Sequence, residues 1–178
     1  MVATSTVPKL TLNDWLNNPP PRTEWVDGGL IQKQGMTLKH SKLQRRLSTL
    51  WSLYADAQNL GGEVYTEAPC RTQNQGRFPD VAYLTPALLT QYGDAKVLPQ
   101  SFPLSAEIVS PTDLAEDMIA KAYEYLASGG EEVWLVYPDS RWIIVVTANN
   151  KQIFGQGEMA ETQKALEGFS ISVDTLLA

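Results

Sequence analysis

The stretch "LSAEIVSPTDLAEDMIAKAYEYLASGGEEVWLVYP", Leu104 to Pro138, contains a strand, a helix and a second strand in close succession. The apolar runs "LSAEIVS" and "EEVWLVY" predict the two strands. Between them, Ser110 and Pro111 are typical of the N-cap and the first residue of a helix, which we expect to continue to about Ser128, before two glycines. Glu107 needs an explanation, because it places a carboxylate in the middle of an apolar strand.

The sequence on either side adds elements of both kinds. Apolar residues at helical spacing predict a helix from Leu38 to Ala57. The runs "EVYTEAPCRT" and "FPDVAYLT" predict two strands, and "TEWVDGGLIQKQ" predicts a hairpin that turns at Asp27-Gly28-Gly29. The central order is therefore helix, three strands, helix and strand. This order predicts an α/β fold with a mixed sheet flanked by helices.

The chain has 178 residues, so we expect residues 1–178 to form one domain. Its first residues contain no apolar signal-peptide segment, and the chain contains no apolar run of about 18 residues that would predict a membrane span. The only cysteine, Cys70, cannot form an internal disulfide, which fits a reducing cytoplasm. With one cysteine and one histidine, a Cys/His zinc site is excluded. Any metal would be held by oxygen ligands, which suits Mg²⁺, Ca²⁺ or Mn²⁺.

The charge is unevenly distributed along the chain. The formal net charge is −6, but residues 1–60 contain seven lysines and arginines against four acids. Most of this basic excess lies in "KHSKLQRR", Lys39 to Arg46. Overall acidity argues against a dedicated, tight nucleic-acid binder, whereas the local basic helix is compatible with weaker polyanion binding.

Two carboxylates, Asp80 in "FPDVAYL" and Glu107 in "SAEIVS", are predicted to lie inside strands. A lone buried carboxylate costs several kcal/mol unless it is paired or protonated. On neighbouring strands, the two acids could share a divalent cation. Alternatively, each could form a salt bridge or face solvent on an edge strand. A pair of acids is also found in glycosidases, but the aromatic residues here occupy core-like periodic positions rather than a sugar platform.

Lys121 follows Glu107 by 14 residues. If the intervening helix packs back along its strand, its axial rise returns Lys121 to about the level of Glu107. The lysine side chain leans toward the helix N-terminus and closes the remaining gap. Alternatively, Lys121 could form a surface ion pair with Asp117 at i, i+4 spacing, worth a few tenths of a kcal/mol.

These features resemble a known family. Pro79-Asp80 followed by Glu107 is similar to the signature of the PD-(D/E)XK nuclease superfamily, and the chain as a whole resembles the Uma-type restriction endonucleases. The matching segments span most of the chain and are "TEWVDGGLI", His40 opening the basic helix, "RFPDVAYL", "AEIVSPTDLAEDMIAKAYEYLASGGEEVWLVYPDSR" and "ISVDTLL". The resemblance implies a restriction-endonuclease-like core. In the superfamily pattern a lysine follows two residues after the glutamate, where this chain has Val109; the Uma-type pattern moves that lysine to the helix, where Lys121 stands.

The resemblance implies a Mg²⁺- or Mn²⁺-dependent endonuclease that hydrolyses DNA. Asp80, Glu107 and the carbonyl of Ile108 would hold the metal. Lys121 would orient the attacking water, and Glu24 would bind the metal through water or position the lysine. The expected nucleic-acid contacts are Lys39, His40, Lys42 and Arg46.

Two features depart from a typical member: the acidic net charge and the lack of a visible target-recognition domain. The expected partner is DNA, bound weakly or transiently because of the net charge of −6. No membrane partner is expected, and a homodimer is compatible with the sequence. The alternative function is a non-catalytic scaffold with the nuclease fold.

Overall fold

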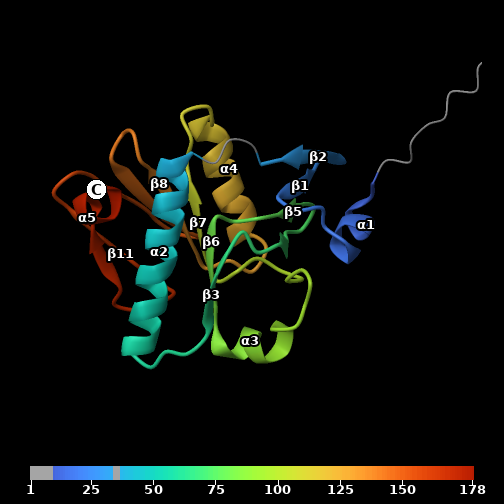
Figure 1. Cartoon of the computed structure of the whole chain (residues 1–178), viewed down its shortest axis with the longest axis horizontal. Coiled ribbons are helices and arrows are strands. Elements are labelled where there is room, and N and C mark those ends of the chain that lie inside the picture. Colours follow the sequence, from blue (N-terminus) through green and yellow to red (C-terminus); the bar gives the residue numbers. More distant parts are fainter. Residues whose placement is uncertain (1–9, 34–36) are drawn as a thin grey trace, which may run out of the picture.

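The computed structural model describes residues 10–33 and 37–178. The N-terminal residues on which the expectation of no signal peptide rests lie mostly outside this range. At the centre is a six-stranded sheet with the order β10-β9-β8-β7-β6-β3 (Figure 1). All neighbours in this sheet are antiparallel except β7 and β8, which are parallel and are joined by a helix, α4. The sheet is therefore mixed, as the element order predicted. Its strands are β3 (Glu63–Thr66), β6 (Val81–Leu84), β7 (Leu104–Ile108), β8 (Glu132–Tyr137), β9 (Trp142–Thr147) and β10 (Lys151–Phe154).

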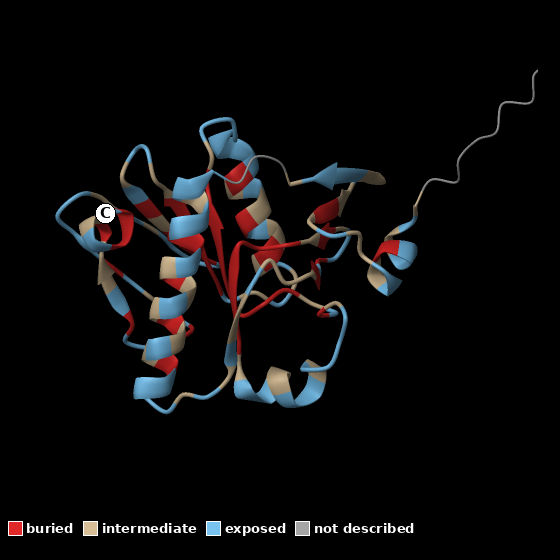
Figure 2. Cartoon of the chain, in the orientation of Figure 1, coloured by how far each residue is buried: buried red, intermediate tan, exposed pale blue. Residues whose placement is uncertain are grey.

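Two helices, α2 (Leu38–Ala57) and α4 (Ala115–Leu126), cover the opposite faces of this sheet. In β7, Leu104, Ala106 and Ile108 belong to the core cluster under α2, whereas Val109, the residue directly after β7, belongs to the cluster under α4. Successive side chains of a strand point to opposite faces, so Glu107 faces the α4 side. Figure 2 shows that buried residues concentrate in the central strands and on the inner sides of both helices.

A smaller, four-stranded sheet lies beside the large one and has the order β2-β1-β5-β4. Its first two strands form the predicted hairpin, and Asp27 and Gly28 both have positive φ, as a two-residue hairpin turn requires. Trp15 fixes this sheet to the N-terminal helix: a Cβ atom on Gly76 would lie 2.4 Å from the Trp15 ring. The elements are α1 (Leu12–Asn17), β1 (Thr23–Val26), β2 (Gly29–Gln32), β4 (Cys70–Arg71) and β5 (Gly76–Arg77).

The remaining elements complete the outside of the domain. Helix α3 (Pro86–Tyr92) follows β6, and a two-stranded sheet of β11 (Met159–Glu161) and β12 (Ser170–Ser172) leads into α5 (Val173–Leu177). Helix α5 packs against α2. Within residues 10–33 and 37–178, no helix combines the length and apolar character needed to cross a bilayer.

Three local predictions differ from the structure. Helix α4 begins at Ala115 after Leu114, rather than at Ser110-Pro111. The reason is a closed turn, in which the Ser110 amide donates to the Asp113 carboxylate (2.8 Å) and the Asp113 amide donates to the Ser110 carbonyl (3.0 Å). These bonds close a separate turn, and the extended backbone of Leu114 (φ −78°, ψ 132°) separates this turn from the helix.

The other two differences concern strand boundaries. The predicted strand "EVYTEAPCRT" is divided at Glu67, whose positive φ (52°) redirects the chain from β3 in the large sheet to β4 in the small one. Asp80 is not inside a strand, because β6 begins one residue later at Val81. Asp80 is nevertheless buried, with 1% of its surface exposed.

Candidate active site

Asp80 and Glu107 lie side by side at the junction of the two sheets. In the antiparallel pairing of β6 and β7, Val81 is opposite Ala106, which puts the preceding Asp80 beside Glu107. The Ile108 amide donates to Asp80 Oδ2 (2.7 Å), so the backbone of β7 orients this carboxylate. Both acids are buried and line a cavity of about 280 Å³.

Lys121 reaches the same cavity from α4. Its Nζ lies 2.9 Å from Glu107 Oε1 and 3.0 Å from Glu24 Oε1. The helix therefore packs back along its strand as the spacing predicted, and the ion pairs found for Lys121 among the described residues do not include Asp117. The Tyr125 hydroxyl, one turn further along α4, donates to Glu107 Oε1 (2.7 Å). Burial opposes the charged form of Lys121, but Glu107 and Glu24 raise its pKa, so it remains an ammonium.

Glu24 enters from β1 and is held by donors on three sides. Besides Lys121, it accepts from Arg77 Nη1 (3.0 Å) and from the Phe78 amide (3.2 Å). Arg77 also binds Glu124 of α4, with Nε 2.9 Å from Oε1. Burial would raise the pKa of Glu24, but Lys121, Arg77 and Lys33 lower it to about 2. Glu24 is thus a buried, ionised carboxylate that links the small sheet to α4.

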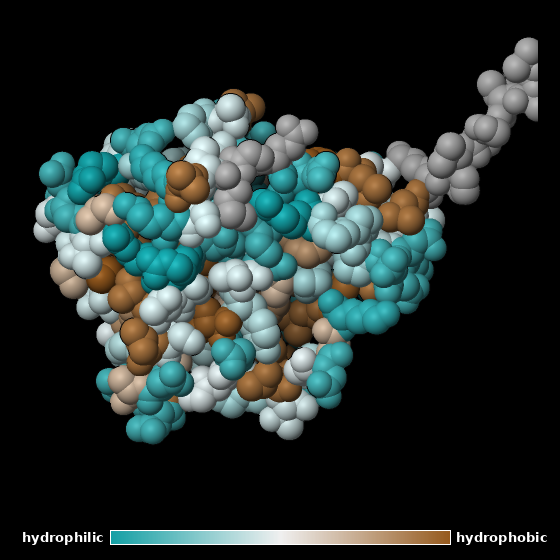
Figure 3. All heavy atoms as spheres, viewed as in Figure 1, coloured by the Kyte–Doolittle hydropathy of each residue, from teal (hydrophilic) through white to brown (hydrophobic). Residues whose placement is uncertain are grey.

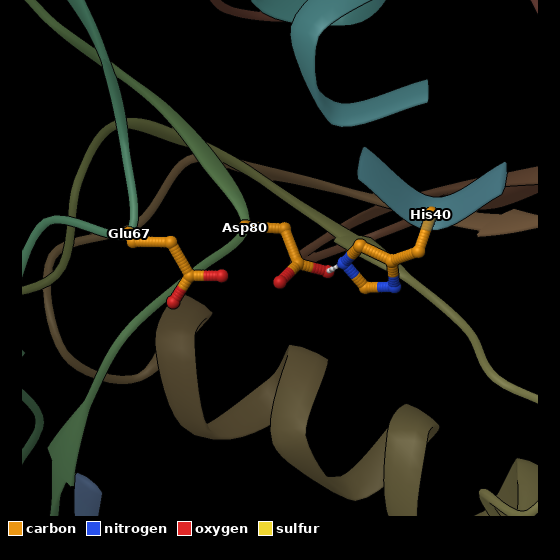
Figure 4. Close-up of side chains that lie close together, drawn as sticks. All are labelled: His40, Glu67 and Asp80. Atoms are coloured by element: carbon orange, nitrogen blue, oxygen red, sulfur yellow. Dashed lines mark ion pairs between the residues drawn. The ribbon is translucent and has the colours of Figure 1, made fainter. Parts of the chain in front are cut away.

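The remaining part of the site contains Lys33 and Glu67, which sequence reasoning missed, together with His40, which it named as a nucleic-acid contact. Lys33, at the end of the hairpin, places Nζ 2.6 Å from Asp80 Oδ1 and 3.6 Å from Glu67 Oε2. His40, from the start of α2, places Nε2 3.3 Å from Asp80 Oδ2. Figure 4 shows Asp80 between Glu67 and His40, with the ion pair between Asp80 and His40 drawn as a dashed line. Burial would raise the pKa of Asp80, but Lys33 and His40 hold it below its ordinary value.

Only one of the four expected nucleic-acid contacts reaches this site. His40 does so through Asp80, whereas Lys39 pairs with Asp139 at 2.5 Å. Lys42 donates to the Ala178 carbonyl (2.6 Å), and Arg46 donates to the same carbonyl (2.8 Å) and to two others in α5. Helix α2 therefore uses two of its basic side chains to bind the end of α5. The face of the molecule in Figure 3 is mixed, with hydrophilic residues interrupted by separate hydrophobic areas.

The charges around the cavity form two groups of ion pairs, one centred on Lys33 and the other on Lys121 and Arg77, and these groups lie next to each other where Asp80 is beside Glu107. Together we call them the charge cluster. It contains five carboxylates and three cationic side chains, which leaves an excess of two negative charges when all of these groups are ionised and His40 is left out of the count. A single divalent cation would balance this excess, and the carboxylate and carbonyl oxygens present are the ligands that Mg²⁺ and Mn²⁺ prefer. The donor set therefore fits a divalent cation. Its members are Glu24, Lys33, Glu67, Arg77, Asp80, Glu107, Lys121 and Glu124.

Comparison with known proteins identifies the family of this chain. A solved structure from Anabaena variabilis ATCC 29413, described as "a putative nuclease belonging to DUF820", has the same fold: its TM-score is 0.82, it is 19% identical in sequence, and the match covers 94% of this chain and 97% of that one. No curated protein matches the chain. The family model "Uma2: Putative restriction endonuclease" matches residues 10–174. The chain, which combines this nuclease-like fold with the charge cluster, therefore belongs to the Uma2 family.

Proposed function

We propose that this protein is a Mg²⁺- or Mn²⁺-dependent endonuclease that hydrolyses phosphodiester bonds in DNA, with residues 1–178 acting as one nuclease domain. The observation that carries the proposal is the convergence of Asp80, Glu107 and Lys121 in one cavity, with Lys121 Nζ 2.9 Å from Glu107. Family membership favours a nuclease, and the excess of two negative charges in the charge cluster favours a divalent cation.

Asp80, Glu107 and the Ile108 carbonyl would hold the cation. When bound, it supplies positive charge to the scissile phosphate and lowers the pKa of a coordinated water. The Tyr125 hydroxyl donates a hydrogen bond to Glu107 Oε1, and the Ile108 amide donates one to Asp80 Oδ2. Each carboxylate is therefore oriented before a ligand binds. Such preorganisation reduces the cost of reaching a productive geometry.

Lys121 would orient the attacking water and offset the negative charge that develops on the phosphate. Glu24 would act as a positioning residue, because it binds Lys121 Nζ at 3.0 Å and is itself fixed by Arg77. Hydrolysis would form a phosphorus–oxygen bond from water, which gives up a proton, and break the phosphorus–oxygen bond of the ester, whose leaving alkoxide takes up a proton and becomes a hydroxyl. Weak DNA binding is expected, because the chain carries a net charge of −6.

The test compares the parent protein with Asp80→Asn and with Asp117→Asn, an exposed acid of α4 that serves as the control. We expect cleavage of plasmid DNA with Mg²⁺ or Mn²⁺, no cleavage with EDTA, and a loss of about 100-fold or more in Asp80→Asn. Mn²⁺ should also raise the melting temperature of the parent and the control, because it binds only the folded state, but not that of Asp80→Asn.

Cleavage in EDTA at the rate seen with metal, or cleavage by Asp80→Asn at the parental rate, would contradict the proposal. A parent that is stabilised by Mn²⁺ but cleaves neither single-stranded nor double-stranded DNA would favour the non-catalytic scaffold.

A further inference from the structure

The ammonium of Lys33 sits in a group of protein oxygens, which we call the lysine cage. Nζ lies 2.6 Å from Asp80 Oδ1, 2.7 Å from the Phe78 carbonyl and 3.6 Å from Glu67 Oε2. The side chains of Lys33 and Glu67 are each 17% exposed, and that of Asp80 is 2% exposed. Nζ donates hydrogen bonds to the Asp80 carboxylate and the Phe78 carbonyl, and it forms an ion pair without a hydrogen bond with Glu67. Lys33 is therefore a partly buried cation held at a defined position.

Glu67 is built into this cage at some energetic cost. Its φ of 52° is positive, a conformation that costs a non-glycine residue about 1 kcal/mol or more. Its amide donates to the Asp80 carbonyl (3.3 Å), and Gln44 of α2 donates to both Glu67 Oε1 (3.3 Å) and the Asp80 carbonyl (2.8 Å). Glu67 Oε2 is buried and has no hydrogen-bond partner among the described residues. The local backbone and Gln44 thus direct one carboxylate oxygen toward Lys33.

The lysine cage overlaps a set of potential metal ligands. One ligand atom each from His40, Glu67 and Asp80 lies within 4.8 Å of the other two, as their arrangement in Figure 4 indicates. Imidazole and carboxylate together suit Mn²⁺ among other divalent ions. Asp80 belongs to this set and also to the Asp80–Glu107 pair, so an ion in each place would form a two-ion site that shares Asp80. Sites of that kind hold their ions about 3.5–4 Å apart.

We infer that Lys33 is the second cation of this site: its ammonium occupies the place that a second divalent ion would take among His40, Glu67 and Asp80, so the protein binds one divalent ion and not two. This inference rests on the proposed function, because it assumes the first ion at Asp80 and Glu107. A fixed ammonium beside Asp80 supplies positive charge near the phosphate without a second metal. The carboxylates of Asp80 and Glu67 pair with this ammonium at 2.6 and 3.6 Å.

The experiment counts Mn²⁺ ions by isothermal titration calorimetry and by electron paramagnetic resonance. The parent should bind one ion. Lys33→Met, which keeps the length of the side chain and removes its charge, should bind two ions whose spectra show Mn–Mn coupling at about 4 Å. The double variant Lys33→Met/Glu67→Gln should return to one ion. Lys39→Met is the matched control, because Lys39, in the first turn of α2, pairs with Asp139 outside the lysine cage. The Lys39→Met protein should bind one ion.

Each outcome has a definite meaning. A Lys33→Met protein that binds one ion with the parental affinity overturns the inference and leaves the proposed function standing. A parent that already binds two ions overturns it as well, and this result does not depend on whether any variant folds. If Lys33→Met does not fold, Lys33→Gln takes its place with the same expected count. A parent that binds no Mn²⁺ under conditions where Lys33→Met also binds none contradicts the proposed function itself.

Discussion

At the residue scale, Lys121 and Val109 show why the lysine of this site comes from a helix. Val109 is 6% exposed and packs in the apolar cluster under α4 with Met118 and Ala122. A lysine at position 109 would place its ammonium among apolar side chains, which is costly without a partner. Lys121 instead extends from α4 toward β7 and forms ion pairs with Glu107 and Glu24. Its charge is therefore paired although its side chain is only 13% exposed.

The first residue-scale prediction concerns Lys121→Met. If Lys121 acts on the water and phosphate, cleavage should fall by about 100-fold or more. The protein should also lose about 3 kcal/mol of its free energy of unfolding, because the change leaves Glu24 and Glu107 buried without their shared cation. A surface pair with Asp117 would have cost at most about 0.5 kcal/mol. The pairs of Lys121 with Glu24 and Glu107 therefore distinguish it from the alternative, a surface pair with Asp117, under which the lysine could be removed at little cost.

The measurements are plasmid cleavage at matched metal and salt, and urea unfolding. Lys96→Met, which removes an exposed lysine, should leave both unchanged and serves as the control. Parental cleavage by Lys121→Met would assign Lys121 a purely structural role.

At the scale of elements, α4 is the part of the fold that joins the two sheets. Lys121, Glu124 and Tyr125 lie on one side of this helix at i, i+3 and i+4 spacing. Lys121 and Tyr125 bind Glu107 of the large sheet, while Glu124 binds Arg77 of the small sheet. Arg77 in turn binds Glu24 of β1. The position of Glu24 beside Lys121 therefore depends on a side chain from β5.

The prediction at this scale is a coupling between Arg77 and Glu124. Arg77→Met should lower the free energy of unfolding by about 3 kcal/mol, because it leaves Glu124 without its cation and the buried Glu24 with only Lys121. In a double-mutant cycle with Glu124→Gln, the coupling energy should be at least about 1 kcal/mol, since the two side chains are in direct contact. The coupling energy is measured by urea unfolding of the parent, the two single variants and the double variant. Arg71→Met, on neighbouring β4 and exposed, is the control, and additive effects of Arg77→Met and Glu124→Gln would refute the coupling.

At the scale of the whole molecule, the charge cluster lies between two sheets and makes the stability of the fold depend on pH. Glu24 has an ordinary pKa of 4.5 and a folded pKa of about 2. A carboxylate with a lowered folded pKa stabilises the fold fully above its unfolded pKa, and this stabilisation is lost as pH falls toward the folded pKa. Burial raises the pKa of Glu107, so its ionisation acts in the opposite direction as pH rises.

We therefore expect the parent to lose stability between about pH 5 and pH 2, with Glu24 contributing up to about 3 kcal/mol of the change. Glu24→Gln should reduce this pH dependence, because a glutamine does not titrate. The check is urea unfolding at several pH values, with Glu116→Gln, an exposed acid of α4, as the control. The same dependence on pH in Glu24→Gln and in the parent would show that Glu24 is not the titrating group.

The sequence by itself determined the elements of the core and three residues of the site. Helices α2 and α4, the β1–β2 hairpin and the order of the central strands follow from apolar periodicity and turn residues, which are local properties of the chain. Asp80, Glu107 and Lys121 could be identified because a carboxylate in an apolar run conflicts with burial, and because helix and strand rises bring Lys121 back to Glu107. The family pattern added Glu24.

Tertiary structure alone decided the rest of the site. Lys33 is 47 residues from Asp80 in sequence, and Arg77 is 53 residues from Glu24, so neither pairing has a local signature. Glu67 joins them only because its positive φ redirects the chain between two sheets. Lys42 and Arg46, which a basic helix suggests as phosphate contacts, bind carbonyls of Ala178 and of α5 in the folded chain. Such ion pairs depend on how distant segments pack, because a charged side chain pairs with the oppositely charged or polar groups that the folded chain places within a few ångströms.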